Sequence, residues 1–143
     1  DIYLNMQLYK LFLMIDIMLK SNYEFHKAFI SSKILLKNKY LLDKIYLIDN
    51  LLQNGKSIND SFYKSQIFDD IVLNLINTAE VSNSLSVGIN EIKKIYKNRF
   101  DDKISLLISL IQPIFLIVIM SLILWIVLAI FMPIWDMGNM IKV

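Results

Sequence analysis

The sequence is poor in the residues that build most enzyme sites. Its 143 residues include no cysteine, one histidine, three glycines and two prolines. Without cysteine the chain can form no disulfide and no thiolate zinc site. It also lacks a glycine-rich phosphate loop, a nucleophile elbow and a calcium-binding loop. The lone histidine, His26, is interpreted as a surface or helix-end residue. We therefore expect no catalytic residue, no metal and no cofactor, and a membrane-bound enzyme would have to work through Glu80 or His26.

Apolar residues are in excess, at 56% of the chain against roughly 45–50% in soluble proteins. No charged residue occurs between Ile104 and Trp135, a stretch longer than the ~20 residues with which a helix crosses the hydrocarbon core. A buried core helix would need more surrounding protein than the rest of the chain supplies. We predict a bundle domain over residues 1–105, a transmembrane helix over residues 106–133 and a short extracytoplasmic tail over residues 134–143.

Both prolines lie in this apolar stretch. Pro133 predicts the end of the membrane helix, because proline disfavours helix in the residue before it. Pro113 removes a hydrogen bond to the Ser109 carbonyl and predicts a kink, so that a helix ending at Gln112 joins the membrane-spanning one. The kink is interpreted either as a tolerated bend or as one that sets how the bundle sits under the bilayer.

The net charge of +2 is too small to indicate nucleic acid binding. Its distribution is more informative, because cations gather before the apolar stretch and only Lys142 follows it. Basic residues favour the cytoplasmic side, so we expect residues 1–105 to be cytoplasmic and the basic run to meet anionic lipid headgroups. No signal peptide is visible and the chain begins at Asp1, so we interpret it as part of a longer protein. The basic run comprises Lys93, Lys94, Lys97, Arg99 and Lys103.

The remaining sequence predicts an all-α fold with an internal repeat. "DIMLKSNYEFHKAF", residues 16–29, aligns with "DNLLQNGKSINDSF", residues 49–62, at an offset of 33 residues. Each copy predicts a helical hairpin: an apolar helix, a turn that tolerates positive φ, and a short helix ending in Phe. Ser57 and Asp60 predict a capping box on the second short helix. A period near 33 also fits a helical solenoid, but two copies are fewer than the three or so that a solenoid needs.

Two further helices follow. Asp69 or Asp70 is expected to cap a helix that runs to Glu80, and the Ser82–Ser84 segment is expected to break it with Asn83 in left-handed geometry. The last helix begins near Leu85. Its apolar stripe predicts a helix that continues into the membrane without a linker. The stripe comprises Ile92, Ile95, Tyr96, Phe100, Ile104 and Leu107.

Three pieces of the chain, "AEVSNSL", "IQPIFLIVIM" and "MPIWDMG", resemble the type II secretion F family. These are inner-membrane platform proteins of type II secretion systems and of type IV or competence pili. The family has a Gly-Glu-x-x-Gly-x-Leu turn, a Glu-Pro or Gln-Pro opening of the membrane helix and a Pro-Ile exit, and its hairpin turn Gly-x-Ser is similar to "NGKS". The matching or substituted residues are Gly55, Ser57, Glu80, Asn83, Leu85, Gln112, Pro113, Pro133 and Ile134.

The chain departs from the family pattern at three positions. Ala79 and Asn83 stand where the family prefers glycine, and Asp69 stands where proline is common. Asn83 can adopt the same left-handed geometry, whereas Ala79 predicts a less tight contact between helices.

The resemblance implies a fold and a role. Family members carry two six-helix cytoplasmic domains and three membrane helices, so this chain would be the second domain plus the last membrane helix of a multi-pass protein in the bacterial inner membrane. It implies no catalytic activity, self-association into homo-oligomers, and contacts with a cytoplasmic assembly ATPase, inner-membrane alignment proteins and pilins or pseudopilins. The alternative is a tail-anchored helical adaptor that binds other proteins.

Overall fold

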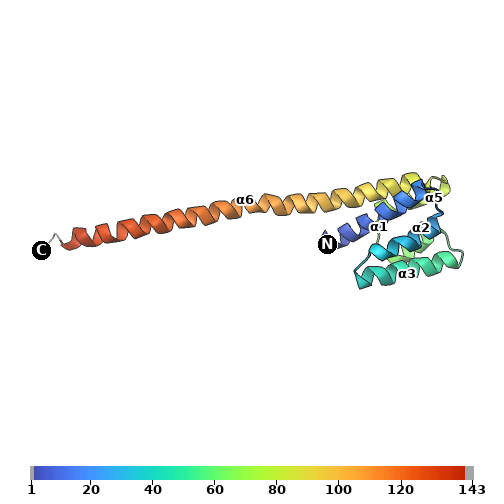
Figure 1. The fold of residues 1–143 in the computed structure, drawn as a ribbon, viewed down its shortest axis with the longest axis horizontal. Coiled ribbons are helices and arrows are strands. Elements are labelled where there is room, and N and C mark those ends of the chain that lie inside the picture. Colours follow the sequence, from blue (N-terminus) through green and yellow to red (C-terminus); the bar gives the residue numbers. More distant parts are fainter. Residues whose placement is uncertain (1, 141–143) are drawn as a thin grey trace. The chain divides into compact units, whose positions relative to one another are not determined.

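The protein is described by a computed structural model that covers the backbone of residues 2–140 and the side chains of residues 2–135. Within these residues the chain is all-α, as predicted, with six α-helices, one short 3₁₀ helix and no strand (Figure 1). The elements are α1 Ile2–Lys20, α2 Phe25–Ser32, η1 Lys33–Leu35, α3 Lys39–Gln53, α4 Ile58–Ser65, α5 Asp70–Val81 and α6 Leu85–Met140.

The chain divides into two compact units, Asp1–Asp102 and Lys103–Val143. We call the first unit the bundle. It holds α1 to α5 and the first turns of α6, while the second unit is the remainder of α6. Lys142, the cation expected beyond the membrane segment, lies outside the described residues.

The predicted repeat is confirmed by two helical hairpins, α1 with α2 and α3 with α4. Each hairpin turns through one residue in left-handed geometry, Asn22 at φ 63° and Gly55 at φ 76°. These two residues are 33 positions apart in the alignment. Asparagine and glycine are the residues for which this conformation costs least. The left-handed geometry predicted for Asn83, between α5 and α6, is confirmed by its φ of 50°.

The second helix of each hairpin is longer than predicted. Phe29 and Phe62 are fully buried, but α2 and α4 continue three residues beyond them, to Ser32 and Ser65. The hydroxyl of each serine donates to the phenylalanine carbonyl at 2.6 Å. These bonds satisfy carbonyls at the helix ends, which explains why the helices do not stop at Phe.

A group of aromatic rings joins the two hairpins in a single core, as in a bundle rather than a solenoid. The ring of Phe62 lies 5.6 Å from Phe29, 6.5 Å from Phe12 and 4.9 Å from Phe68, measured between centroids. Phe12 in turn stacks on Tyr96 of α6 at 5.5 Å with an interplanar angle of 6°. Phe62 therefore contacts rings from α1, α2 and the segment after α4, and Phe12 extends the group to α6.

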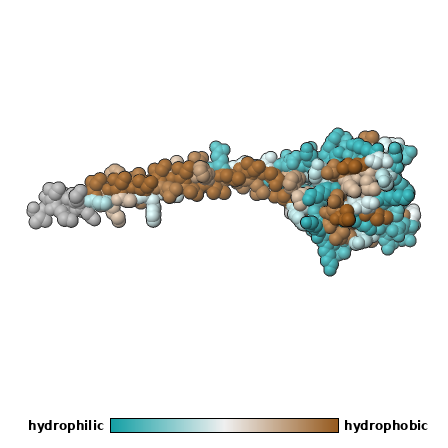
Figure 2. Space-filling model, viewed as in Figure 1, coloured by the Kyte–Doolittle hydropathy of each residue, from teal (hydrophilic) through white to brown (hydrophobic). Residues whose placement is uncertain are grey.

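In the part of the chain that the structure describes, two helices, α1 and α6, are long and apolar enough to cross a membrane. α1 directs Leu8, Leu11, Phe12 and Ile15 into the core of the bundle, as a core helix of a folded domain does. α6 differs, because the most apolar part of its length is fully exposed to its surroundings and appears almost uniformly hydrophobic in Figure 2. α6 is accordingly the helix that we treat as the candidate membrane span.

α6 is continuous through both prolines, so two predicted boundaries are wrong. The backbone does not divide into separate helices at Pro113, and α6 does not end at Pro133 but continues to Met140. Proline has a φ suited to a helix and removes a single hydrogen bond from the ladder, at a carbonyl four residues earlier. In a helix of this length the flanking hydrogen bonds are enough to carry the backbone past both positions.

Candidate functional site

The candidate site is the face of α6 that the bundle holds. Along this face Ile89, Ile92 and Tyr96 are each no more than 2% exposed, and their spacing of three and four residues places them on one side of a helix. Only part of the predicted apolar stripe is buried. Ile95 and Phe100 are half-buried, and Leu107 is exposed. The bundle therefore holds α6 from Gly88 to the turn around Arg99.

A buried ion pair fixes the middle of this face to α1. The Nζ of Lys93 donates to Asp16 Oδ2 at 2.7 Å, and Lys20 donates to the same oxygen at 2.9 Å. Lys93 also donates to Asn90 Oδ1 at 2.8 Å. Burial alone would raise the pKa of Asp16, but the hydrogen bonds from Lys93 and Lys20 outweigh it and hold that pKa below its ordinary value. Asp16 therefore stays ionised at neutral pH although only 2% of the residue is exposed.

A second ion pair lies one to two turns further along α6. Arg99 pairs with Asp69, whose other carboxylate oxygen accepts from Val72 N at 3.3 Å and so caps α5 as predicted. The Arg99 guanidinium lies 5.4 Å from the centroid of the Tyr96 ring. Burial, together with the nearby charge of Asp69, raises the pKa of Tyr96 despite the opposing effect of Arg99. Asp69, at the position where proline is common in the resembled family, thus joins the start of α5 to α6.

α5 approaches α6 closely at Gly88. A Cβ added at this glycine would lie 2.4 Å from the Cβ of Ala79 in α5, far inside van der Waals contact. Ala79 is 4% exposed. The prediction of a less tight contact at Ala79 is therefore wrong. Gly88 has no Cβ, and this absence lets the two helices approach each other at Ala79.

We expect Gly88→Ala to destabilise the bundle by about 1–3 kcal/mol, the usual cost of overpacking a close contact. Ala79→Gly in the same chain removes the opposing methyl group, so the double variant should recover most of the loss. The double variant moves the glycine from α6 to α5 and the alanine from α5 to α6, so its total helix propensity is nearly that of the natural chain. Denaturant unfolding of the full chain in detergent, followed by circular dichroism, measures both variants. A double variant no more stable than Gly88→Ala would contradict the contact.

Residues of the resembled motifs connect the end of α5 with the turn that precedes α4. Both oxygens of the Glu80 carboxylate accept from backbone amides at the start of α4, from Ile58 N at 2.7 Å and from Asn59 N at 2.8 Å. Ser57 Oγ accepts from Asp60 N at 3.1 Å, so three amides that the helix itself leaves without partners are satisfied. Glu80 lies in the last turn of α5, and its carboxylate thereby fixes the beginning of α4.

The capping box is only half confirmed. Ser57 caps α4 as predicted, but the carboxylate of Asp60 pairs with Lys64 at 3.2 Å. Glu80 satisfies the amides of Ile58 and Asn59, whereas the acidic residue of a capping box would accept from the amide of Ser57. Leu85 begins α6 and is partly buried against the core, directly after the left-handed Asn83.

The other motif residues belong to the second unit. Gln112, Pro113, Pro133 and Ile134 all lie within α6 and are exposed. The structure therefore brings Gly55, Ser57, Glu80, Asn83 and Leu85 to adjoining turns of the bundle, and it places the remaining four on the apolar part of α6.

The basic run before the apolar stretch is largely engaged within the protein. Lys93 and Arg99 hold the bundle as described above, and Lys94 pairs with Glu91 at 2.7 Å. At least three of its five cations thus have acidic partners, which reduces the charge that this run offers to lipid headgroups.

His26 belongs to a hydrogen-bonded network between α2 and α3. Asp49 Oδ1 lies 3.0 Å from His26 Nε2 and accepts from Gln53 Nε2 at 3.1 Å, while Asp49 Oδ2 accepts from Lys33 Nζ at 2.9 Å. Burial raises the pKa of Asp49, but Lys33 and His26 outweigh it and leave that pKa below its ordinary value. This network ties neighbouring helices together. Among the residues whose side chains are described, no group of three metal-ligating side chains occurs.

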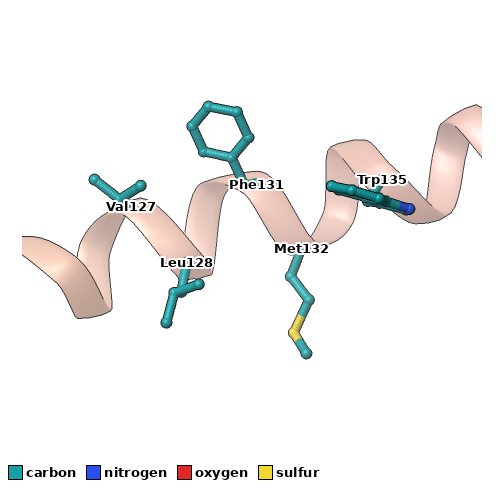
Figure 3. A pocket seen from close by; sticks show the side chains of 5 residues that line it. All are labelled: Val127, Leu128, Phe131, Met132 and Trp135. Atoms are coloured by element: carbon teal, nitrogen blue, oxygen red, sulfur yellow. The ribbon is translucent and has the colours of Figure 1, made fainter.

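Towards Trp135, the candidate membrane span of α6 presents an apolar surface. An open notch of about 520 Å³ is lined by five side chains of the helix itself. Figure 3 shows Leu128 and Met132 pointing to one side of the helix and Val127 and Phe131 to the other, with Trp135 one turn beyond. No polar atom lines this notch, so it suits acyl chains or apolar side chains rather than a polar ligand.

Comparison with known proteins gives one match. The family model described as "Type II secretion system (T2SS), protein F" matches residues 14–133, more than four fifths of the chain. The matched range includes α2 to α5, the last seven residues of α1, and α6 as far as Pro133. No curated protein and no solved structure gives a significant match.

Proposed function

Since the chain belongs to the type II secretion system protein F family, we propose that it is a non-enzymatic platform protein of the bacterial inner membrane. In this role it couples a cytoplasmic assembly ATPase to the assembly of pilins or pseudopilins. Alignment proteins of the inner membrane and further copies of the chain are its other partners. The family membership supports a membrane component of secretion machinery, and the ATPase and pilin contacts are our extension of it.

One observation carries the proposal: α6 is both a structural helix of the bundle and the apolar helix. Its first turns are held by Gly88, Lys93, Tyr96 and Arg99, and the same helix continues without a break to Met140. A helix whose backbone hydrogen bonds continue through the junction can transmit displacement or rotation, whereas a flexible linker cannot. We propose that residues 1–105 are cytoplasmic, that residues 106–133 cross the membrane and that residues 134–143 form an extracytoplasmic tail.

The proposal is tested with two inserts of equal length after Asp102 that differ only in stiffness. One variant of the full-length protein receives seven Gly/Ser residues at this point, and its control receives the helical insert Glu-Ala-Ala-Ala-Lys-Glu-Ala. Seven residues make about two turns, so the control nearly preserves the direction of each face. We expect the flexible insert to abolish filament assembly or secretion and the helical insert to retain it, with equal membrane insertion of both.

The two alternatives give different results. A tail-anchored adaptor needs α6 only as a tether and would work with either insert. Full function of the flexible variant would therefore reject force transmission through α6. Deletion of the bundle with the membrane helix retained should also abolish assembly, and normal assembly without the bundle would reject the platform role altogether.

A further inference from the structure

A groove on the bundle lies between α1 and η1. It has a volume of about 420 Å³, and its lining is mostly apolar with two lysines. Ile34 is 85% exposed and adjoins the other apolar residues of the lining, so that it belongs to an apolar patch. The lining residues are Lys10, Leu13, Met14, Ile17, Ile34, Leu35 and Lys37.

The two lysines lie at the same end of this groove. Gln7 Oε1 accepts from Lys37 N at 3.0 Å, so the chain at Lys37 runs beside the Gln7 turn of α1. Lys10 follows Gln7 by three residues, which places it on the adjacent turn of the same helix face. From Lys10 the apolar floor continues to Ile17 for about 10 Å of helix. No carboxylate lines the groove, so its lysine end suits an acidic group.

The internal repeat places the complementary face on α3. At the offset of 33 residues, Lys10 corresponds to Asp43, and the floor residues Leu13 and Met14 correspond to Tyr46 and Leu47. Asp43 is exposed, Tyr46 is 56% exposed and Leu47 is 40% exposed. We call Asp43, Tyr46 and Leu47 the α3 ridge. The two faces therefore share the apolar positions of Leu13 and Met14, whereas Ile17 corresponds to Asn50, and the charge at the first position is reversed.

The groove and the α3 ridge are also neighbours. Lys33, the residue before Ile34, places its Nζ 4.5 Å from the centroid of the Tyr46 ring. Two faces that adjoin on one molecule and complement each other can pair twice across a two-fold axis, each groove receiving the ridge of the other copy. Opposite charges at matching positions fix the register of such a pairing.

We propose that the groove between α1 and η1 binds the α3 ridge of a second copy of this chain, with Asp43 of one copy facing Lys10 and Lys37 of the other. Leu47 and Tyr46 then cover the apolar floor formed by Leu13 and Met14. This surface is distinct from the face of α6 held by the bundle. The proposal does not depend on coupling to an ATPase, since two copies could associate in this way in any membrane-anchored protein.

Disulfide crosslinking in membranes tests this pairing directly, because the natural chain has no cysteine. Two differently tagged full chains are co-expressed, one with Leu13→Cys and the other with Leu47→Cys, and are oxidised mildly. We expect a mixed dimer that contains both tags. The matched control replaces Leu47→Cys by Val81→Cys, at an exposed position on α5, and should give little mixed dimer. Equal crosslinking of the two pairs would indicate random collision and overturn the proposal.

Charge reversal gives a second, independent readout. Lys10→Asp in the copy with Leu13→Cys should reduce the crosslinked fraction about fivefold, the effect of one exposed charge pair. Asp43→Lys in the partner copy should restore it. Both positions are exposed, so neither change affects the core. Failure of the partner change to restore the dimer would overturn the assigned register. The assay reads dimer formation alone, so its result is separate from that of the filament assembly test.

Discussion

Asp16→Asn lowers the free energy of unfolding of the bundle by about 3 kcal/mol at pH 7, the lower end of the range for breaking one side of a buried ion pair. The expectation follows from the position of the carboxylate, whose side chain is 3% exposed and which accepts from both Lys93 and Lys20. Asparagine leaves Lys93, itself only 19% exposed, without its countercharge. Denaturant unfolding of the full chain in detergent, followed by circular dichroism, measures the loss.

The same variant should change the response to acid. The pKa of Asp16 is lower in the folded chain than its ordinary value of 3.8. Its stabilising contribution is therefore present above about pH 4 and is lost as the pH falls through the folded-state pKa. The stability difference between the natural chain and Asp16→Asn should narrow below about pH 4. A difference that stays constant from pH 7 to pH 3 would contradict the ionised pair.

Two controls separate the buried pair from charge in general. Asp60→Asn breaks the exposed pair with Lys64, whose side chains are 41% and 47% exposed, and should cost less than 1 kcal/mol. Replacing both buried partners, by Asp16→Leu with Lys93→Met, should recover most of the stability, because a buried pair often contributes no more than apolar side chains of similar size. If Asp60→Asn were as costly as Asp16→Asn, burial would not be the cause.

The sequence predicted those parts of the structure that are determined locally. Ser57, Asp69 and Asn83 lie at helix ends, where a side chain bonds to an amide two or three residues away or where the backbone needs left-handed geometry. These preferences act within one turn of chain, so residue type and order are sufficient to find them. The internal repeat extended the prediction to whole hairpins.

The contacts that hold α6 could not be found in this way. Lys93 and Asp16 are 77 residues apart, and nothing in the sequence around Lys93 distinguishes it from neighbouring lysines of the basic run. Glu80 was identified from the resemblance alone, and its role depends on α4, more than 20 residues earlier. Distant pairings are decided by how the hairpins pack, and packing follows from the whole core rather than from any local pattern. The one available signal was Asp16, the single acidic residue of α1.

Pro133 illustrates the opposite error, in which a local preference was given too much weight. Proline disfavours helix in the residue before it, yet α6 continues past this position. The preference is statistical and costs one hydrogen bond, and a long helix can absorb that cost. The same reasoning applies to Ala79, where the residue type suggested a loose contact and the partner Gly88 made it close.

Phe62→Ala should lower the free energy of unfolding by about 4 kcal/mol, within the range for removing a buried phenylalanine. Phe62 is fully buried, and its ring lies within 6.5 Å of four other phenylalanine rings. Alanine leaves a cavity among rings that come from α1, α2 and the segment after α4. Tyr63→Ala is the matched control, because the neighbouring side chain is 67% exposed and its loss should cost less than 1 kcal/mol.

Amide hydrogen exchange shows whether Phe62 joins the hairpins or only stabilises its own helix. Because its ring contacts reach both hairpins, Phe62→Ala should reduce protection in α1 and α2 as well as in α4. Phe29→Ala, the equivalent change in the first hairpin, removes two of the described ring contacts rather than four and should cost less. Loss of protection confined to α4 would mean that the hairpins are stabilised separately, and the bundle could then not hold α6 as one unit.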